Sequence, residues 1–438
     1  MRALLINPNI HDFAAYDFWL KPLGILYVGA FLKRLGFEVH LIDTLNRHDK
    51  DLKRFVKVPK DKKYGTGKFP SRVIEKPKVV KNIPRKFKEY GAPPEYLEWK
   101  MKEIGNVDIV MVTSTMTYWY HGVWETIRRI KKITDSPVIL GGIYTQIIPQ
   151  HAKKSPADFV FPTNRLELLP KFLNDILNLH LKDIDIDWFE DLDPAYELYK
   201  SIGYLVFTSS IGCPFRCTYC ITPRMWKFKR RTPEKVVESI LRYKDIFDVR
   251  DIVFFDDAFL VGKGHTVKLL KLIKNERIKT RFHLPNGIHA RLIDEEIAYL
   301  LKEANFKTIY LGYETSGELQ EKTGGKVFDK DLIRAVEFLK NAGFTKDEIR
   351  AYVLVNLPGQ KLQDAIRAVE FLKELDIGIS VNEYTPIPGT PEWNELIKNG
   401  KIAPDIDPLL LDNSILPYWW NGGMSKEEVE YVKSIVRS

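Results

Sequence analysis

The chain has 438 residues, of which 45% are hydrophobic and 12% aromatic, enough to bury the cores of two or three domains. Glycine and proline occur at ordinary levels and 29% of the residues are charged, which excludes collagen-like, low-complexity and disordered chains. No run approaches the ~18 apolar residues of a membrane span, and MRALLINPN leads into an apolar strand without a signal-peptide pattern. We therefore expect a cytoplasmic protein without a membrane span.

Apolar runs alternate with amphipathic stretches over the first 180 residues, a pattern typical of parallel strands covered by helices on both faces. This predicts an α/β, doubly wound, Rossmann-like domain over residues 1–180, with five strands. The strands are predicted at ALLIN, FEVHLID, VDIVMVTS, PVILGG and ADFVFP. Ligands of such folds bind beyond the carboxyl ends of the strands, here residues 7–9, 113–119 and 141–145.

The net charge of +9 comes from one part of this domain. Residues 47–103 contain 18 Lys and Arg against 8 Asp and Glu, and the rest of the chain sums to −1. With its prolines and little periodicity, the segment is predicted to be a long insertion. Two interpretations stay open: a solvated basic loop, or a docking surface for an acidic partner, a nucleic acid or a phosphorylated substrate.

A second alternating series follows the acidic and aromatic connector 181–200. Six strands are predicted over residues 201–395, with helices starting near Pro233, His265, Asp294, Lys330 and Leu362. Because six repeats are two short of a closed eight-fold barrel, we expect an open partial (βα)6, TIM-like barrel. Residues 396–438 form a C-terminal tail. Functional side chains should lie at the carboxyl ends of the strands, at Cys213, Asp256, Asp257, Asn286, Glu314 and Asn356.

All three cysteines fall in one loop after the first barrel strand, with the spacing C-x3-C-x2-C in Ser210–Cys220. Three thiolates can ligate three irons of a four-iron cluster and leave the fourth iron open to another ligand. A structural zinc site needs four closed ligands, and the nearest histidines in sequence are His180 and His265. Zinc and three buried structural cysteines are therefore the weaker alternatives.

This loop resembles the signature of the radical S-adenosylmethionine (radical SAM) family, including the aromatic Tyr219. The resemblance implies that Cys213, Cys217 and Cys220 hold a [4Fe–4S] cluster and that SAM, near Tyr219, chelates the open iron. A reduced cluster would then cleave SAM to a 5′-deoxyadenosyl radical. The resemblance also implies a reductant protein of the ferredoxin or flavodoxin type as a partner.

Two further motifs resemble those of the elongator-like and cobalamin-linked groups of this family. Phe255–Phe259 matches F-x-D-D-x-F, which implies that Asp256 and Asp257 meet the SAM amino group or the substrate. The alternative for Asp257 is a helix N-cap. Glu383–Thr390 matches Y-x-P-x-P-G-T, whose prolines alternatively only shape a barrel edge.

Two strand ends complete the resemblance in the barrel. Glu314, in a G-x-E-S/T segment, would face SAM or the substrate, and as a buried carboxylate it needs a partner, for which we expect His289 or Arg291. The N-L-P-G-Q turn starting at Asn356 resembles the G-L-P-G-E turn near the adenine of SAM. Asn356 replaces the usual glycine and Gln360 the usual glutamate, which puts their contacts in doubt.

A doubly wound domain ahead of such a barrel resembles the cobalamin-binding domain of cobalamin-dependent radical SAM enzymes. The D-x-H-x-x-G motif of other cobalamin proteins is absent, so no histidine is predicted below the cobalt. The aromatic residues 118–120 would cover that lower face; the alternative is ordinary packing. The predicted cobalamin-binding residues are Asn7, Thr113, Ser114, Thr115, Thr117, Tyr118, Trp119, Gly141 and Gly142.

These motifs predict a cobalamin-dependent radical SAM C-methyltransferase acting at an unactivated carbon, with no individual catalytic residue assigned. Its cofactors would be a [4Fe–4S] cluster, SAM and cobalamin. One alternative is a radical SAM cyclase or rearrangement enzyme in which cobalamin donates no methyl group. Another is a non-enzymatic cobalamin- or redox-sensing module. A methylthiotransferase would need three more cysteines for a second cluster, and the sequence has none.

Overall fold

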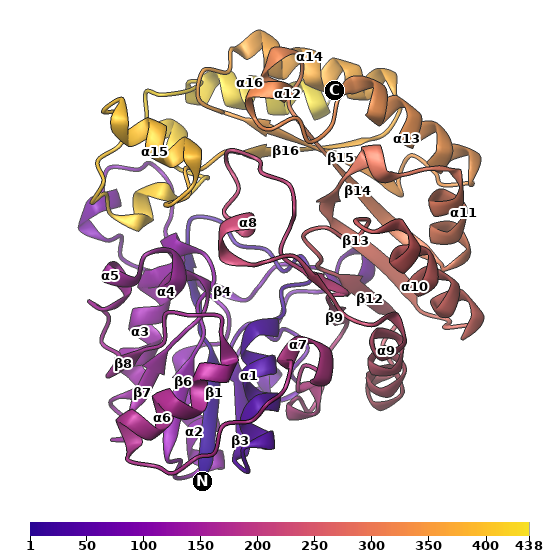
Figure 1. The fold of residues 1–438 in the computed structure, drawn as a ribbon. Coiled ribbons are helices and arrows are strands. Elements are labelled where there is room, and N and C mark those ends of the chain that lie inside the picture. The colour runs from indigo at the N-terminus through magenta and orange to yellow at the C-terminus, as the bar shows by residue number, and fades with distance from the viewer. Residues whose placement is uncertain (438) are drawn as a thin grey trace. The chain divides into compact units, whose positions relative to one another are not determined.

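The structure is a computed structural model that describes residues 1–437 (Figure 1). The chain divides into two compact units, Met1–Gly203 (unit 1) and the residues from Tyr204 on (unit 2). Within the described range, every helix is too short or too polar to pass through a lipid bilayer.

Unit 1 is built on a five-stranded parallel sheet, as the apolar runs predict. In spatial order the strands are β3 (Glu38–Asp43), β1 (Arg2–Asn7), β6 (Ile109–Val112), β7 (Val138–Leu140) and β8 (Phe159–Val160). Because β3 and β6 lie on opposite sides of β1, the winding direction reverses there. The carboxyl ends of β1 and β6 therefore form the switch point at which doubly wound sheets bind ligands.

The helices of unit 1 connect these strands and cover their apolar side chains. They are α1 (Leu23–Arg34), α2 (Pro94–Ile104), α3 (Tyr120–Ile130), α4 (Ile143–Ile147), α5 (Pro149–Ala152), α6 (Leu169–Leu177) and α7 (Trp188–Asp191), with 3-10 turns η4 (Thr117–Trp119), η5 (Leu166–Leu168) and η6 (Tyr196–Leu198). The central strands β6 and β7 are buried along their whole length, which explains their continuous apolar sequence.

The basic insertion is more ordered than a solvated loop. It contributes α2, the short turns η1 (Asp51–Arg54), η2 (Lys63–Gly65) and η3 (Lys78–Val80), and two strands of an antiparallel sheet. That sheet has the order β2 (Ile10–Asp12), β5 (Lys88–Tyr90), β4 (Ser71–Val73). Phe69 and Phe87 are buried, and the fully buried Arg47 side chain donates to Asp17 at 2.9 Å. These anchors hold the insertion against the domain.

Unit 2 is an open sheet of six parallel strands in chain order, as expected for a partial barrel. The strands are β9 (Leu205–Phe207), β12 (Asp251–Phe254), β13 (Arg281–Ile288), β14 (Phe306–Glu314), β15 (Ile349–Val355) and β16 (Gly378–Glu383). A small hairpin of β10 (Ser210–Ile211) and β11 (Lys229–Arg230) flanks the cysteine loop. Three stacked rings, Phe254, Phe282 and Phe306, form part of the core, with centroids 5.4–6.2 Å apart.

The helices of unit 2 follow the strands, and α10, α11, α13 and α14 lie along one side of the curved sheet (Figure 1). The helices are α8 (Thr222–Met225), α9 (Pro233–Phe247), α10 (Lys263–Asn275), α11 (Glu295–Glu303), α12 (Glu318–Lys322), α13 (Asp329–Asn341), α14 (Leu362–Glu374), α15 (Pro391–Lys398) and α16 (Lys426–Arg437), with 3-10 turns η7 (Ala290–Leu292), η8 (Pro408–Leu411) and η9 (Leu416–Tyr418). Their starts follow local rules: Pro233 opens α9 at N1, and Asp294 caps α11 by accepting from the Ile297 amide.

Candidate functional site

The cysteine loop begins at the carboxyl end of β9 and turns sharply at Gly212. Gly212 has φ 74°, and a Cβ there would lie 2.8 Å from the Trp226 carbonyl oxygen, so only glycine suits the turn. The three cysteines are free thiols; Cys217 is buried, and Cys213 and Cys220 are half-buried. The loop therefore presents unpaired sulfur ligands at the end of the sheet where functional groups of barrels gather.

Burial favours the neutral thiol at two of these cysteines. It raises the pKa of Cys213 to about 11, and it raises the pKa of Cys217 although the Lys326 ammonium opposes this. Bound iron would deprotonate them. No three ligating side chains within residues 1–437 converge on a single-ion site. Three thiols are one ligand short of a closed structural zinc site, and they suit a four-iron cluster in which each thiolate would bind a different iron.

Asp256 secures the base of the cysteine loop. Its carboxylate is 2% exposed and accepts from the Ser209 hydroxyl at 2.6 Å, the Ser209 amide at 3.0 Å and the Ser210 hydroxyl at 2.7 Å. The Asn286 side-chain amide donates to its carbonyl oxygen at 3.2 Å. The carboxylate oxygens are thus engaged in holding the loop, and a contact with SAM stays a prediction.

Asp257, the next residue, has an exposed side chain, and its carboxylate accepts a long hydrogen bond of 3.5 Å from the Thr222 hydroxyl. The protein atoms around it and the neighbouring Asp256 carboxylate raise the pKa of Asp257 to about 6. The next helix, α10, begins at Lys263 with Gly262 at its N-cap position. The alternative that Asp257 is a helix cap is therefore wrong, and a contact of its carboxylate with SAM or the substrate stays a prediction.

Glu314 pairs with Lys326, a residue that the sequence motifs did not single out. The Lys326 ammonium donates to the Glu314 carboxylate at 3.1 Å and to the Gly287 carbonyl at 2.9 Å. Burial lowers the pKa of Lys326, but Glu314 and the thiols of Cys217 and Cys220 outweigh burial and raise it. The expected partners were wrong: His289 and Arg291 instead contact the ring of Phe215.

Glu314 has a backbone conformation that explains this pairing. Its φ is 70°, in the left-handed region, beside an irregularity in the β14–β15 register between Gly312 and Glu314. A Cβ on Gly312 would lie 2.3 Å from the Lys326 ammonium. The close approach of Lys326 thus depends on the glycine at position 312, two residues before Glu314. This glycine is the feature of the sequence that could have indicated the contact.

Asn356 lies at the end of β15 in a fully buried position with φ 69°. Among the described residues neither atom of its amide has a hydrogen-bond partner. Gln360 closes the same turn, because its side chain donates to the Leu354 carbonyl at 3.0 Å and accepts from the Leu357 amide at 3.2 Å. Tyr219 packs against the apolar cluster that includes Leu357. Asn356 is therefore placed at the strand end, and Gln360 has a structural role.

The predicted residues of unit 1 come together at the switch point of its sheet. Asn7, Ser114, Thr115 and Trp119 line one small pocket with Pro8, Asn9, Ile10, Leu45 and Val123. The Ser114 hydroxyl donates to the Gly141 carbonyl at 2.6 Å, and Asn7 donates to Asp43 at 2.7 Å. These polar groups thus order the strand ends around the pocket.

The remaining predicted residues of unit 1 differ in exposure. Thr113 and Thr117 are buried, and Tyr118 is half-buried. Gly142 has φ 100°, and a Cβ there would lie 2.2 Å from the Ser114 carbonyl oxygen, so this glycine allows two strand ends to approach. Gly141 borders open surface, where an added Cβ would meet only the Phe161 carbonyl at 3.8 Å. Gly142 is explained by packing, whereas Gly141 leaves room for a ligand.

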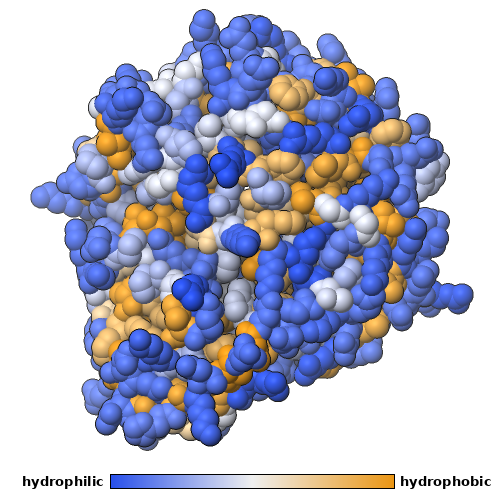
Figure 2. Space-filling view, viewed as in Figure 1, coloured by the Kyte–Doolittle hydropathy of each residue, from blue (hydrophilic) through white to orange (hydrophobic). Residues whose placement is uncertain are grey.

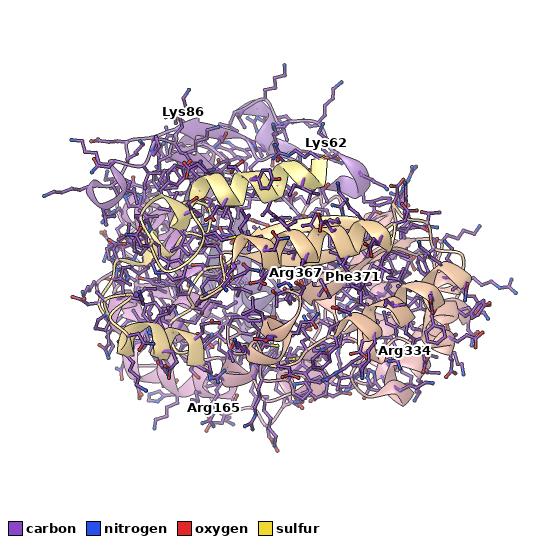
Figure 3. The ribbon with its side chains drawn as sticks, turned by 90° about the horizontal axis from the view of Figure 1, so that it is seen from above. Lys62, Lys86, Arg165, Arg334, Arg367 and Phe371 are labelled. Atoms are coloured by element: carbon purple, nitrogen blue, oxygen red, sulfur yellow. The ribbon has the colours of Figure 1, made fainter. Side chains whose placement is uncertain are left out.

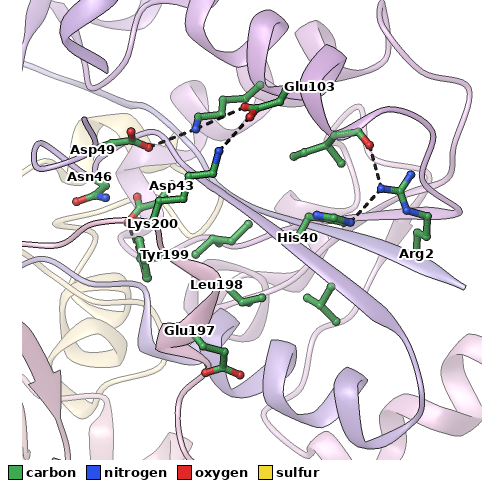
Figure 4. A pocket seen from close by; sticks show the side chains of 14 residues that line it. Arg2, His40, Asp43, Asn46, Asp49, Glu103, Glu197, Leu198, Tyr199 and Lys200 are labelled. Atoms are coloured by element: carbon green, nitrogen blue, oxygen red, sulfur yellow. Dashed lines mark hydrogen bonds and ion pairs between the residues drawn. The ribbon is translucent and has the colours of Figure 1, made fainter. Parts of the chain in front are cut away.

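A second pocket in unit 1, of about 370 Å³, lies along the edge strand β3 (Figure 4). Lys100 pairs with Asp51 at 2.8 Å and Lys200 with Glu103 at 3.0 Å. Arg2 contacts Glu38 at 3.2 Å. Because its cationic side chains are each paired with a carboxylate, this pocket does not indicate a particular ligand.

Comparison with known proteins finds a family match within unit 2. Residues 207–394 match the family model described as the radical SAM superfamily. The chain is 27% identical to an uncharacterised methyltransferase of Pyrococcus horikoshii, covering 47% of this chain and 46% of that protein. It is 26% identical to the hopanoid C-2 methylase of Rhodopseudomonas palustris, covering 52% and 45%. The chain thus spans less than half the length of these two relatives.

A solved structure resembles nearly the whole chain. The radical S-adenosylmethionine methyltransferase TsrM from Kitasatospora setae, with cobalamin and a [4Fe–4S] cluster bound, superposes with a TM-score of 0.66 at 17% identity. The match covers 91% of this chain and 78% of TsrM. At this identity the likeness establishes the fold, a doubly wound domain followed by a partial barrel.

Proposed function

Since residues 207–394 are a radical SAM domain, we propose that this protein is a cobalamin-dependent radical SAM methyltransferase that acts on an unactivated carbon. The observation that carries the proposal is the combination of a three-cysteine loop at the first barrel strand with a doubly wound unit ahead of the barrel. TsrM shares this architecture over 91% of the chain, and its structure contains both cobalamin and a [4Fe–4S] cluster.

The residues of unit 2 suit a four-iron cluster and SAM. Cys213, Cys217 and Cys220 would hold three irons. When bound, the cluster and SAM supply a carbon radical that removes a hydrogen atom from the substrate, and cobalamin supplies the methyl group. Asp256 holds the start of the loop through Ser209 and Ser210, and the Lys326–Glu314 pair lies beside Cys217. The exposed Asp257 carboxylate is our candidate for the SAM amino group or the substrate.

The residues of unit 1 suit cobalamin. The pocket at the switch point is lined by polar side chains, by the apolar Pro8, Ile10, Leu45 and Val123, and by Trp119, whose indole N–H donates to Asp12 at 2.6 Å. Gly141 leaves open surface beside it. Asn7, Ser114, Thr115 and Gly141 would contact the corrin edge, with Thr113, Thr117, Tyr118 and Gly142 supporting them. Tyr120 packs inward against Tyr144 at 6.4 Å between centroids, so Tyr118 and Trp119 are the aromatics left to cover cobalamin.

Two partners belong to this proposal. The domain needs a one-electron reductant, for which we propose a ferredoxin- or flavodoxin-type protein. The basic insertion is proposed as the surface for an anionic partner, because Lys60, Lys62 and Lys86 are exposed and form no ion pair within residues 1–437. The side chains of Lys62 and Lys86 can be found in Figure 3. Figure 2 shows one face of the molecule, on which hydrophilic side chains predominate. A cytoplasmic location stays a prediction from the sequence.

The test is anaerobic reconstitution with iron, sulfide and cobalamin, followed by reduction with dithionite in the presence of SAM. We expect about four irons and one cobalamin per chain, release of 5′-deoxyadenosine, and transfer of label from methyl-labelled SAM to the bound cobalamin. 5′-Deoxyadenosine release without methylation of cobalamin would favour the cyclase or rearrangement alternative. Cofactor uptake without any SAM cleavage would favour a sensing module.

A further inference from the structure

Phe215 lies in the middle of the cysteine loop, two residues from both Cys213 and Cys217, and its half-buried ring contacts two side chains of unit 2. The His289 ring stacks on it with centroids 3.9 Å apart and planes at 28°. The Arg291 guanidinium carbon lies 4.5 Å from the ring centroid. Because His289 directly follows β13 and Arg291 lies in η7, the loop that leaves β9 is attached to the end of a strand two places along the sheet.

A second contact backs the same loop from the turn after α12. The Thr218 amide donates to the Thr323 carbonyl at 3.2 Å, and a Cβ on Gly324 would lie 3.0 Å from Cys217 Cα. Arg291 also donates to the Gly325 carbonyl at 3.4 Å. Arg291 therefore joins the ring of Phe215 and the turn that supports Cys217 into one assembly.

The charges in this assembly favour stacking on the Phe215 ring. Burial, with Lys326 and Arg291 nearby, lowers the pKa of His289 to about 2, so its ring is neutral at working pH. The His289 side chain is 3% exposed, and its Nδ1 has no hydrogen-bond partner among the described residues. His289 thus serves here as a flat packing surface, and Arg291 supplies a cation within 4.5 Å of the ring centroid.

We propose that Phe215 is a positioning residue that fixes the cysteine loop against the barrel before the cluster is assembled. The stacked ring restricts the backbone on both sides of it, and so restricts Cys213 and Cys217 together. A pre-ordered loop loses less conformational entropy when it binds iron than a mobile one. The identity of the bound group rests on the proposed function, but the ordering of the loop is a property of the metal-free protein.

The experiment compares Phe215→Ala with Phe215→Tyr, which keeps the stacked ring, and with Phe371→Ala. Phe371 is a matched control: a half-buried ring on α14, 5.5 Å from Tyr313 and remote from the loop in sequence (Figure 3). The first measurement is the rate of thiol alkylation in the metal-free protein, resolved by residue with mass spectrometry. The second is the rate of iron loss to a chelator from the reconstituted protein.

We expect Phe215→Ala to increase both rates roughly tenfold, the size of one aromatic stack together with one cation–π contact. Phe215→Tyr and Phe371→Ala should stay near the wild-type rates, and the thermal unfolding midpoint should hardly change. Arg291→Met, which keeps the ring but removes the cation, should give a smaller increase in the same direction. If Phe215→Ala does not fold, the alkylation rate of Arg291→Met tests the positioning role instead.

Alkylation rates that are the same in Phe215→Ala, Arg291→Met and the wild type would overturn the proposal. The two hypotheses fail separately. If the wild type takes up no iron but the variants still expose their thiols faster, the proposed function is wrong and Phe215 nevertheless orders the loop. If iron binds and alkylation is unchanged, the proposed function stands and the positioning role is rejected.

Discussion

The carboxyl ends of the two sheets carry different kinds of site. In unit 2 the strand ends present chemically distinctive side chains, namely three thiols, two adjacent carboxylates and a half-buried ion pair. In unit 1 they present small residues, amides and glycines that mostly bond one another, as Ser114 does with Gly141. A metal cluster needs particular donor atoms, whereas a large cofactor needs space and a shaped surface. The first requirement is therefore easier to recognise in a sequence than the second.

The strongest test of the unit 2 site removes its donor atoms. The triple change of Cys213, Cys217 and Cys220 to Ala should abolish iron binding and SAM cleavage, because no other cysteine exists in the chain. The far-UV circular dichroism spectrum should hardly change, since the thiols lie on a loop outside the packed sheet. Iron analysis decides it: a triple variant that retains about four irons would reject the assignment.

The corresponding test of unit 1 fills the proposed cobalamin pocket with a larger side chain. Thr115→Trp places a large ring in the pocket at the switch point, where Thr115 is half-buried. We expect cobalamin affinity to fall at least tenfold while iron content is unchanged. Met116→Trp is the matched control, because Met116 is the next residue, is 48% exposed and does not line that pocket. Equal cobalamin binding by both variants would place the cofactor elsewhere.

A third test concerns the Lys326–Glu314 ion pair of unit 2, which the sequence analysis did not predict. Lys326→Met leaves the Glu314 carboxylate, 12% exposed, without its cation. Removing one partner of such a pair costs about 3 kcal/mol when it is fully buried, and less here. We expect the double variant Glu314→Gln, Lys326→Met to recover part of the loss. Thermal unfolding of the two single variants and the double variant measures this coupling, and additive effects would show that the pair contributes nothing.

Features marked by apolar runs or by a compact motif could be predicted from the sequence, whereas contacts that depend on backbone geometry could not. The strands of the two sheets, the open barrel and the cysteine loop followed from apolar runs and from one compact motif, whereas the spatial order of the strands came from the structure. The Lys326–Glu314 pair could not be predicted, because it joins residues twelve positions apart through a left-handed φ at Glu314, which no periodicity indicates. The sheet formed by β2, β5 and β4 was missed since each strand has three residues, too few to show alternation among lysines.

A pH-dependent test concerns the insertion of unit 1. Burial alone would raise the pKa of Glu89, but His11, whose Nε2 lies 3.3 Å from the carboxylate, and the hydrogen-bonded Arg129 outweigh it and lower the pKa to about 2. Because the folded pKa lies below the unfolded value, the stabilisation is complete above about pH 4.5 and is lost as the pH falls toward 2, by roughly 3 kcal/mol in total. Hydrogen exchange of peptides containing β2 and β5 should therefore accelerate between pH 5 and 3 more than exchange elsewhere.

Glu89→Gln removes this titration, so exchange in the two strands should become faster at pH 6 and nearly independent of pH, after correction for intrinsic rates. Glu98→Gln, an exposed change on α2, is the control and should behave like the wild type. Retention of the wild-type pH profile by Glu89→Gln would show that other carboxylates control the acid response of the insertion.

The smallest effect on catalysis is expected from the surface of the same insertion. Reversing the charge of Lys60, Lys62 and Lys63 to Glu changes exposed side chains on a turn-prone segment, so the core around Phe69 should be undisturbed. SAM cleavage without substrate should stay within about twofold of wild type, whereas affinity for an anionic partner should fall. In the wild type, the logarithm of that affinity should decrease linearly with the logarithm of salt concentration, with a slope set by the charges neutralised. Reversal of three charges should make this slope shallower by roughly three if the partner is a nucleic acid. Binding that responds neither to salt nor to these reversals would mean that the lysines of the insertion serve only to solvate it.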